Sequence, residues 1–83
     1  MEYKVLIKLI VPEIEESYEM YIPINKTVGE IAELLCRLVN DLSKVYPLRK
    51  NASLCNRYSD YVYEKNKTIR ETDIRNGTEL VLF

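Results

Sequence analysis

The stretch TIRETDIRNGTELVLF, residues 68–83, decides the fold that we expect for this chain. Its apolar positions are irregularly spaced, at Ile69, Ile74, Leu80 and Leu82. Asn76-Gly77 is a turn signal between the second and the third of them. No single helix or strand fits this spacing, which instead predicts a short turn, a reversal and a last strand over residues 78–83.

Length and composition narrow the possibilities further. With 83 residues and an apolar share of 47%, residues 1–83 have room for a single domain with one small core. No apolar run approaches the ~18 residues that span a bilayer, so we expect no direct membrane insertion. The net charge is -1 and the longest basic block is Arg49-Lys50, which argues against nucleic acid as a partner.

Two strands are expected before the middle of the chain. Over residues 3–11, every second residue is apolar, and the residues between them include both apolar residues and lysines. The alternation resumes over residues 17–22, after an acidic break at residues 12–16. In the second segment, Tyr18 and Ile22 fall on one side and Tyr21 on the other. The two segments therefore predict a β-hairpin with one apolar side.

A helix is expected at about residues 28–45. Thr27 and Glu30 have the spacing of a capping box, and Pro47 sets the end, because a proline disfavours the helical conformation of the residue before it. Gly29 weakens the first turn by about 1 kcal/mol relative to alanine. The stripe expected to cover the sheet consists of Val28, Ile31, Ala32, Leu35, Leu38, Val39 and Leu42.

Beyond the helix, residues 52–57 predict a short strand and the tyrosine-rich residues 58–64 a second extended piece. The resulting order is strand, strand, helix, strand, short piece, strand. This order predicts an α+β protein of the β-grasp type, with a mixed sheet of four to five strands packed on one helix.

The chain resembles ubiquitin over nearly its whole length. The helix of ubiquitin opens after a Thr-Ile pair, to which Thr27-Val28 corresponds, and the four apolar positions of the last stretch keep the spacing of the ubiquitin tail. The resemblance implies a ubiquitin-like β-grasp fold.

A closer resemblance is to the YukD/EsaB-like family, small bacterial proteins encoded with type VII (ESX/WXG100-type) secretion systems. The family ending has two aspartates, where this chain has Glu71 and Thr78, and it shares Ile74 and Gly77. The resemblance implies a cytoplasmic accessory or regulatory component whose partner is a protein, such as a membrane component of the secretion system.

Ubiquitin and the sulfur carriers act through a mobile tail that ends in Gly-Gly, whereas this sequence stops at Phe83, one residue past Leu82. We therefore expect a protein that is not conjugated. The alternative is a sulfur carrier or ubiquitin-like modifier that lacks its diglycine tail in this sequence. A β-grasp domain that binds RNA or a GTPase is a third and weaker alternative.

The strand alternation also predicts where a partner binds. The side of the sheet that faces away from the helix is unusually apolar, and such a patch indicates an interface with a different protein or with a second copy of the chain. The candidate protein-binding residues are Leu6, Ile10, Tyr21, Cys55, Val81 and Phe83. Four of the seven tyrosines, Tyr21, Tyr58, Tyr61 and Tyr63, are expected at the surface, where tyrosine often contributes to interfaces.

Catalytic and cofactor chemistry is not expected. The chain has no histidine, the usual residue for proton transfer near neutral pH. The acidic run Glu13, Glu15 and Glu16 lacks the glycine turn of a calcium loop and reads as a solvated hairpin. Cys36 and Cys55 are expected to be inert thiols that do not form a disulfide, in keeping with a reducing cytoplasm. We expect no catalytic, cofactor-binding or metal-binding residues.

Overall fold

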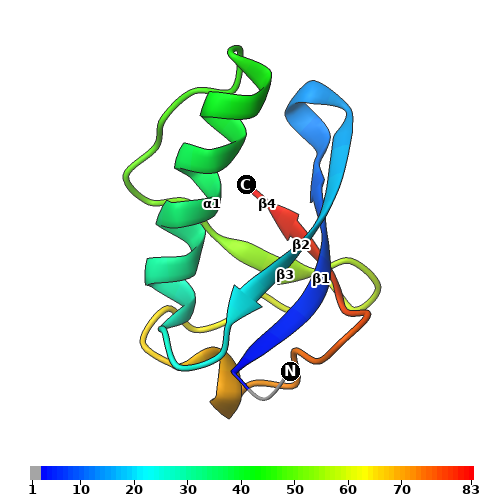
Figure 1. Cartoon of the computed structure of the whole chain (residues 1–83), viewed down its shortest axis with the longest axis vertical. Helices are drawn as coiled ribbons and strands as arrows, with labels where there is room; N and C mark the ends of the chain where they lie inside the picture. The colour runs from blue at the N-terminus through cyan, green and yellow to red at the C-terminus, as the bar shows by residue number, and fades with distance from the viewer. Residues whose placement is uncertain (1–2) are drawn as a thin grey trace.

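A computed structural model describes residues 3–83, in which one helix packs against one face of a four-stranded sheet (Figure 1). The strands are β1 (Lys4–Val11), β2 (Glu16–Pro23), β3 (Leu54–Asn56) and β4 (Glu79–Leu82), and the helix is α1 (Val28–Ser43). Two short 3-10 turns, η1 (Pro12–Ile14) and η2 (Ile69–Glu71), complete the elements. This arrangement confirms the α+β, β-grasp prediction.

The sheet is mixed, with strand order β2-β1-β4-β3. The hairpin pairs β1 with β2 antiparallel, β4 runs parallel to β1, and β3 pairs antiparallel with β4. The strand at one edge is therefore β2, and the strand at the other edge is β3. The predicted last strand is present, and Gly77, at φ +91°, supplies the left-handed turn before it.

The core lies between α1 and the sheet. Its apolar side chains alternate with outward ones along each strand, as the period of two requires. The strands contribute Ile7, Leu9, Val11, Ile22, Leu54, Leu80 and Leu82, and Ile69 and Ile74 close one end.

Helix α1 begins as the sequence predicts. The Glu30 amide donates to the Thr27 hydroxyl over 3.2 Å and the Thr27 amide donates to the Glu30 carboxylate over 3.0 Å, which completes the capping box. The Gly29 amide also donates to the Lys65 carbonyl over 3.0 Å, and a Cβ at residue 29 would stand 3.2 Å from that oxygen. Glycine at this position permits the close approach.

The predicted helical stripe is wrong on one flank. Leu38 and Leu42 are exposed, at 41% and 57%, whereas Cys36 is buried in the core. The sheet ends at β2, so no further strand covers leucines that lie on that side of the helix. The helix also ends at Ser43 and not at residue 45, because Lys44 adopts a left-handed cap at φ 65°.

The predicted extended piece over residues 58–64 does not form a strand. Residues 57–59 make a turn, Asp60 directly after it has φ 59°, and one isolated bridge joins Val62 to Cys55. Tyr63, expected at the surface, is instead buried, because its amide donates to the Leu54 carbonyl over 3.0 Å and its ring enters the core beside β3. Tyr21, Tyr58 and Tyr61 are exposed as predicted.

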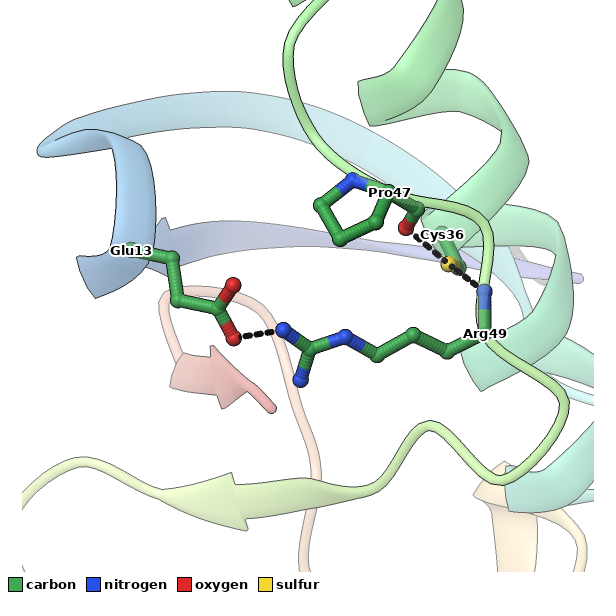
Figure 2. Close-up of polar contacts among 4 residues, drawn as sticks. All are labelled: Glu13, Cys36, Pro47 and Arg49. Atoms are coloured by element: carbon green, nitrogen blue, oxygen red, sulfur yellow. Dashed lines mark hydrogen bonds and ion pairs between the residues drawn. The ribbon is translucent and has the colours of Figure 1, made fainter.

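The segment between α1 and β3 is fastened to the helix by a buried sulfur (Figure 2). The Cys36 thiol donates to the Pro47 carbonyl over 3.5 Å, and the Arg49 amide donates to Sγ over 3.3 Å. The Arg49 guanidinium pairs with Glu13 of the hairpin. Glu13 therefore forms an ion pair with this loop, whereas the sequence predicted only a solvated acidic turn.

Among residues 3–83, no helix has both the length and the apolar character that crossing a membrane requires.

Candidate functional site

The face of the sheet that points away from α1 is the candidate site. On β1, Ile7 and Leu9 enter the core, so the intervening Leu6, Lys8 and Ile10 point outward. The same alternation turns Val81 and Phe83 of the last strand outward, opposite to the buried residues 80 and 82. The outward face carries both apolar and charged side chains.

The strand register brings the outward apolar side chains next to one another. Val81 lies opposite Ile10 on β1 and opposite Cys55 on β3, and Cys55 is in turn bridged to Val62. Residues paired in this way project to the same side of the sheet. Together with Phe83, two positions beyond Val81, they form what we call the apolar cluster: Ile10, Cys55, Val62, Val81 and Phe83.

Phe83 is held in place by its backbone. Its amide donates to the Ser53 carbonyl over 3.0 Å, and the Ser53 amide donates to the Phe83 carbonyl over 2.6 Å. The ring remains 44% exposed. Because the backbone beneath the exposed ring is already fixed, little backbone entropy is lost when a partner covers the ring.

A row of charged residues borders the apolar cluster. Lys8 lies between Glu19 on β2 and Glu79 on β4, and we call these three residues the charged row. Arg57 Nη1 donates to Glu79 Oε1 over 2.5 Å, and the Tyr58 hydroxyl donates to Glu79 Oε2 over 2.9 Å. Both side chains extend the row to the far edge of the sheet.

The charged row divides the six predicted binding residues. All six lie on outward-facing strand positions, but only Ile10, Cys55, Val81 and Phe83 belong to the apolar cluster. Leu6 and Tyr21 lie opposite each other beyond the charged row. Val62 was not among the predicted binding residues. Because neighbouring residues of an extended segment point to opposite sides, the sequence could have assigned Val62 and Tyr63 to opposite faces of the sheet. The face is therefore two apolar areas with charges between them.

Hydrogen bonding and burial shift the pKa values of two groups on this face, the Glu79 carboxyl and the Cys55 thiol. The bond from Arg57, followed by that from Tyr58, holds the pKa of Glu79 below its usual value, so the carboxylate stays charged. The pKa of the Cys55 thiol is raised, first by burial and then by the charge of Asp60. Cys55 therefore contributes a neutral, weakly nucleophilic side chain to the apolar cluster.

The remaining candidates for chemistry are not brought together. Cys36 and Cys55 are free thiols, one buried in the core and the other half-buried on the outward face. Within residues 3–83, no group of three or more His, Cys, Asp or Glu side chains is placed to hold a metal ion.

Comparison with solved structures shows a ubiquitin-like fold. The chain superposes on ubiquitin of Caldiarchaeum subterraneum with a TM-score of 0.66 at 19% identity, over 95% of this chain and 90% of that one. No family model and no curated protein matches the sequence.

Two further neighbours are chains of protein complexes. A chain of the MycP5-free ESX-5 inner membrane complex gives a TM-score of 0.80 at 18% identity, and the match covers 98% of this chain but 21% of that one. A chain of the toluene 4-monooxygenase HD complex also gives 0.80, at 11% identity, over 95% of each chain. Identities this low establish the fold alone, because one fold serves many functions.

Proposed function

We propose that this chain is a non-catalytic ubiquitin-like module that binds a partner protein through the apolar cluster and is not itself conjugated. The apolar cluster is the observation that supports the proposal. It places Ile10, Cys55 and Val81 on paired positions of β1, β3 and β4, adds Val62 through its bridge to Cys55, and adds the exposed ring of Phe83. Apolar side chains that meet on a rigid surface next to charges are typical of protein interfaces.

The finer proposal is that the module is an accessory or regulatory component of a bacterial type VII secretion system and acts in the cytoplasm. The resemblance of the last stretch to YukD/EsaB-like proteins supports this proposal, as does the domain of similar fold in the ESX-5 inner membrane complex. The partner is then a membrane component of that apparatus. A homodimer through the same face is the other outcome to be tested.

The test is affinity capture from the native host with the wild-type protein, Phe83→Ala and Leu6→Asp. If the apolar cluster binds the partner, Phe83→Ala reduces capture of a secretion-system component by about tenfold or more. Leu6→Asp, beyond the charged row, shows whether the second apolar area belongs to the same interface. A matched control is Leu48→Ala, at an exposed apolar position on the loop after α1.

Three results would contradict the proposal. Capture of the same component by all variants would remove the apolar cluster as the binding site. Capture of proteins unrelated to secretion would contradict the secretion role. Sedimentation that shows a dimer, broken by Phe83→Ala, would assign the face to self-association. Absence of conjugation is tested separately, by the intact mass of the protein and of its adducts in host extracts.

A further inference from the structure

A second surface lies on the opposite edge of the sheet, between β2 and α1, and it is separate from the apolar cluster. A cavity of about 150 Å³ opens there. Its walls come from β2 on one side and from the uncovered flank of α1 on the other. They consist of Met20, Tyr21, Ile22, Pro23, Ile31, Leu34, Leu35 and Leu38.

Three exposed leucines of α1 lie along this groove. Leu34, Leu38 and Leu42 are spaced four residues apart, so they form one row along α1 on the side of β2. Leu34 and Leu38 line the cavity, and Leu42 lies one turn beyond it. A cavity near 150 Å³ with apolar walls has room for about one benzene-sized group, as a protein cavity of that size is known to bind benzene.

The backbone of β2 gives the groove a second binding element. The Ile24 amide donates to the Tyr3 carbonyl over 3.0 Å, and the register between β1 and β2 is continuous. Antiparallel bonds alternate along a strand, so the amides and carbonyls of Glu19 and Tyr21 point away from β1. They lie along the free edge of the sheet, where an added strand would pair with them.

The charges at one end of the groove select the partner. Residues 13–19, from η1 into β2, carry four glutamates and no lysine or arginine. Of these, only Glu13 has an ion-pair partner in the part of the chain that the structure describes. Asp41, three residues after Leu38, adds a further carboxylate on the helix side. Glu13 pairs with Arg49 and Glu19 lies opposite Lys8, so the acidic side chains that the hairpin leaves at this end of the groove are Glu15 and Glu16.

We propose that this groove binds an extended segment of a partner protein as an added strand on β2. The segment has alternating branched or aromatic apolar residues, one of which fills the cavity between Leu34 and Leu38. It carries lysine or arginine at the end that lies beside the acidic hairpin. Backbone pairing provides the register, the cavity selects an apolar side chain, and the glutamates select the flanking cations.

The experiment is a selection from a display library of random peptides of about ten residues, the length of a long strand. We expect selected peptides to share alternating apolar residues with lysine or arginine at one end. Leu38→Glu should weaken their binding by about tenfold or more, because it places a charge in the cavity wall. Leu42→Glu is the matched control, with the same change one turn beyond the cavity and an expected loss below about twofold.

Three further measurements make the result decisive. In the wild-type protein, amide exchange at Glu19 and Tyr21 should slow when a selected peptide binds, which requires no variant to fold. Glu16→Lys should weaken binding by about two- to fivefold, whereas Glu64→Lys should not. Phe83→Ala should leave peptide binding unchanged, so that failure of this groove and failure of the apolar cluster are distinguished.

Several results would overturn the proposal. A selection that yields no binding peptides would do so, as would selected peptides that lack the apolar alternation or the cations. Equal binding of a selected peptide by Leu38→Glu and the wild type would also contradict the proposal. So would amide exchange at Glu19 and Tyr21 that does not change when a peptide binds. Peptides that bind as helices would also overturn it.

Discussion

The Tyr63 hydroxyl donates a hydrogen bond to Asp73 Oδ1 over 2.8 Å and so ties the turn after β3 to the segment that leads into β4. Asn56 Nδ2 donates to the same hydroxyl oxygen over 3.3 Å. The ring is buried, with 3% of its surface exposed. A tyrosine expected on the surface thus links β3, through Asn56, to the segment before β4, through Asp73.

This burial predicts loss of stability in alkaline solution. The pKa of Tyr63 is raised from 10.0 to about 12. Burial is the largest cause; the bond from Asn56 lowers the pKa, and the bond to Asp73 raises it. A group whose pKa is higher in the folded state stabilises the fold below its unfolded pKa, and this stabilisation disappears as the pH rises. The free energy of unfolding should therefore fall between pH 10 and about 12.

Denaturant titrations at a series of pH values measure this effect, and ultraviolet absorbance follows phenol ionisation. Tyr63→Phe should reduce the fall in stability over that pH range, since it removes the ionising group. Tyr3→Phe, at an exposed tyrosine, is the control and should leave the slope unchanged. Equal slopes in the wild type and Tyr63→Phe would contradict the prediction.

The two buried tyrosines should respond in opposite ways to the loss of their hydroxyls. The Tyr46 hydroxyl is buried and has no hydrogen-bond partner among the described residues, whereas that of Tyr63 has two. An unsatisfied buried hydroxyl costs about 1–3 kcal/mol, and a satisfied one contributes about 1 kcal/mol. Tyr46→Phe should raise the free energy of unfolding and Tyr63→Phe should lower it.

Denaturant unfolding at neutral pH measures both variants side by side. The Tyr46 ring keeps its contact with the Arg49 guanidinium, 5.4 Å from the ring centre, and its carbonyl keeps the bond from Asn40, so the hydroxyl is the only group changed. A loss of stability in Tyr46→Phe as large as in Tyr63→Phe would show that this hydroxyl has a partner in solution.

The faces of the strands could be predicted from the sequence because their period of two depends only on the local backbone. Ile10 and Val81 were therefore assigned correctly to the outward side. Their assembly with Cys55 depends on register, which alternation alone does not give. The charged row is likewise a product of pairing, since Glu19 and Glu79 are far apart in sequence and meet on the two sides of Lys8.

The errors arose where burial depends on distant segments. Leu38 and Leu42 fit the apolar period of α1, but their exposure depends on where the sheet ends, and no local pattern specifies that β2 is an edge. Tyr63 is buried through its pairing with Leu54 on β3 and its bond to Asp73, and the local alternation of residues reveals neither contact. The β2 groove therefore could not be predicted from the sequence.

Both capping boxes should make the protein sensitive to acid. Hydrogen bonds from the Thr27 backbone and then from its side chain lower the pKa of Glu30 from 4.5, and those of Thr68 do the same for Glu71. A carboxyl group whose pKa is lowered in the folded state stabilises the fold above its unfolded pKa, and the effect is lost as pH falls. The free energy of unfolding should decline below about pH 4.5.

The measurement is denaturant unfolding from pH 6 to pH 2. The double variant Glu30→Gln and Glu71→Gln keeps side-chain acceptors for both amides but removes the titration, so its decline should be shallower than that of the wild type. Glu33→Gln and Glu64→Gln, at exposed positions outside the capping boxes, form the matched control. A control that flattens the curve equally would show that general charge, and not capping, causes the acid sensitivity.

The last prediction concerns the sulfur that fastens the loop after α1. Cys36→Ala removes a buried side chain and both of its bonds, to the Pro47 carbonyl and from the Arg49 amide. It should lower the free energy of unfolding by about 2 kcal/mol and speed hydrogen exchange at the Arg49 amide, which loses its acceptor. Cys55→Ala, at a half-buried cysteine on the outward face, should change stability by less than about 1 kcal/mol and leave that amide protected. Unchanged exchange at Arg49 in Cys36→Ala would mean that the Arg49–Glu13 pair, and not the sulfur, holds the loop against the rest of the fold.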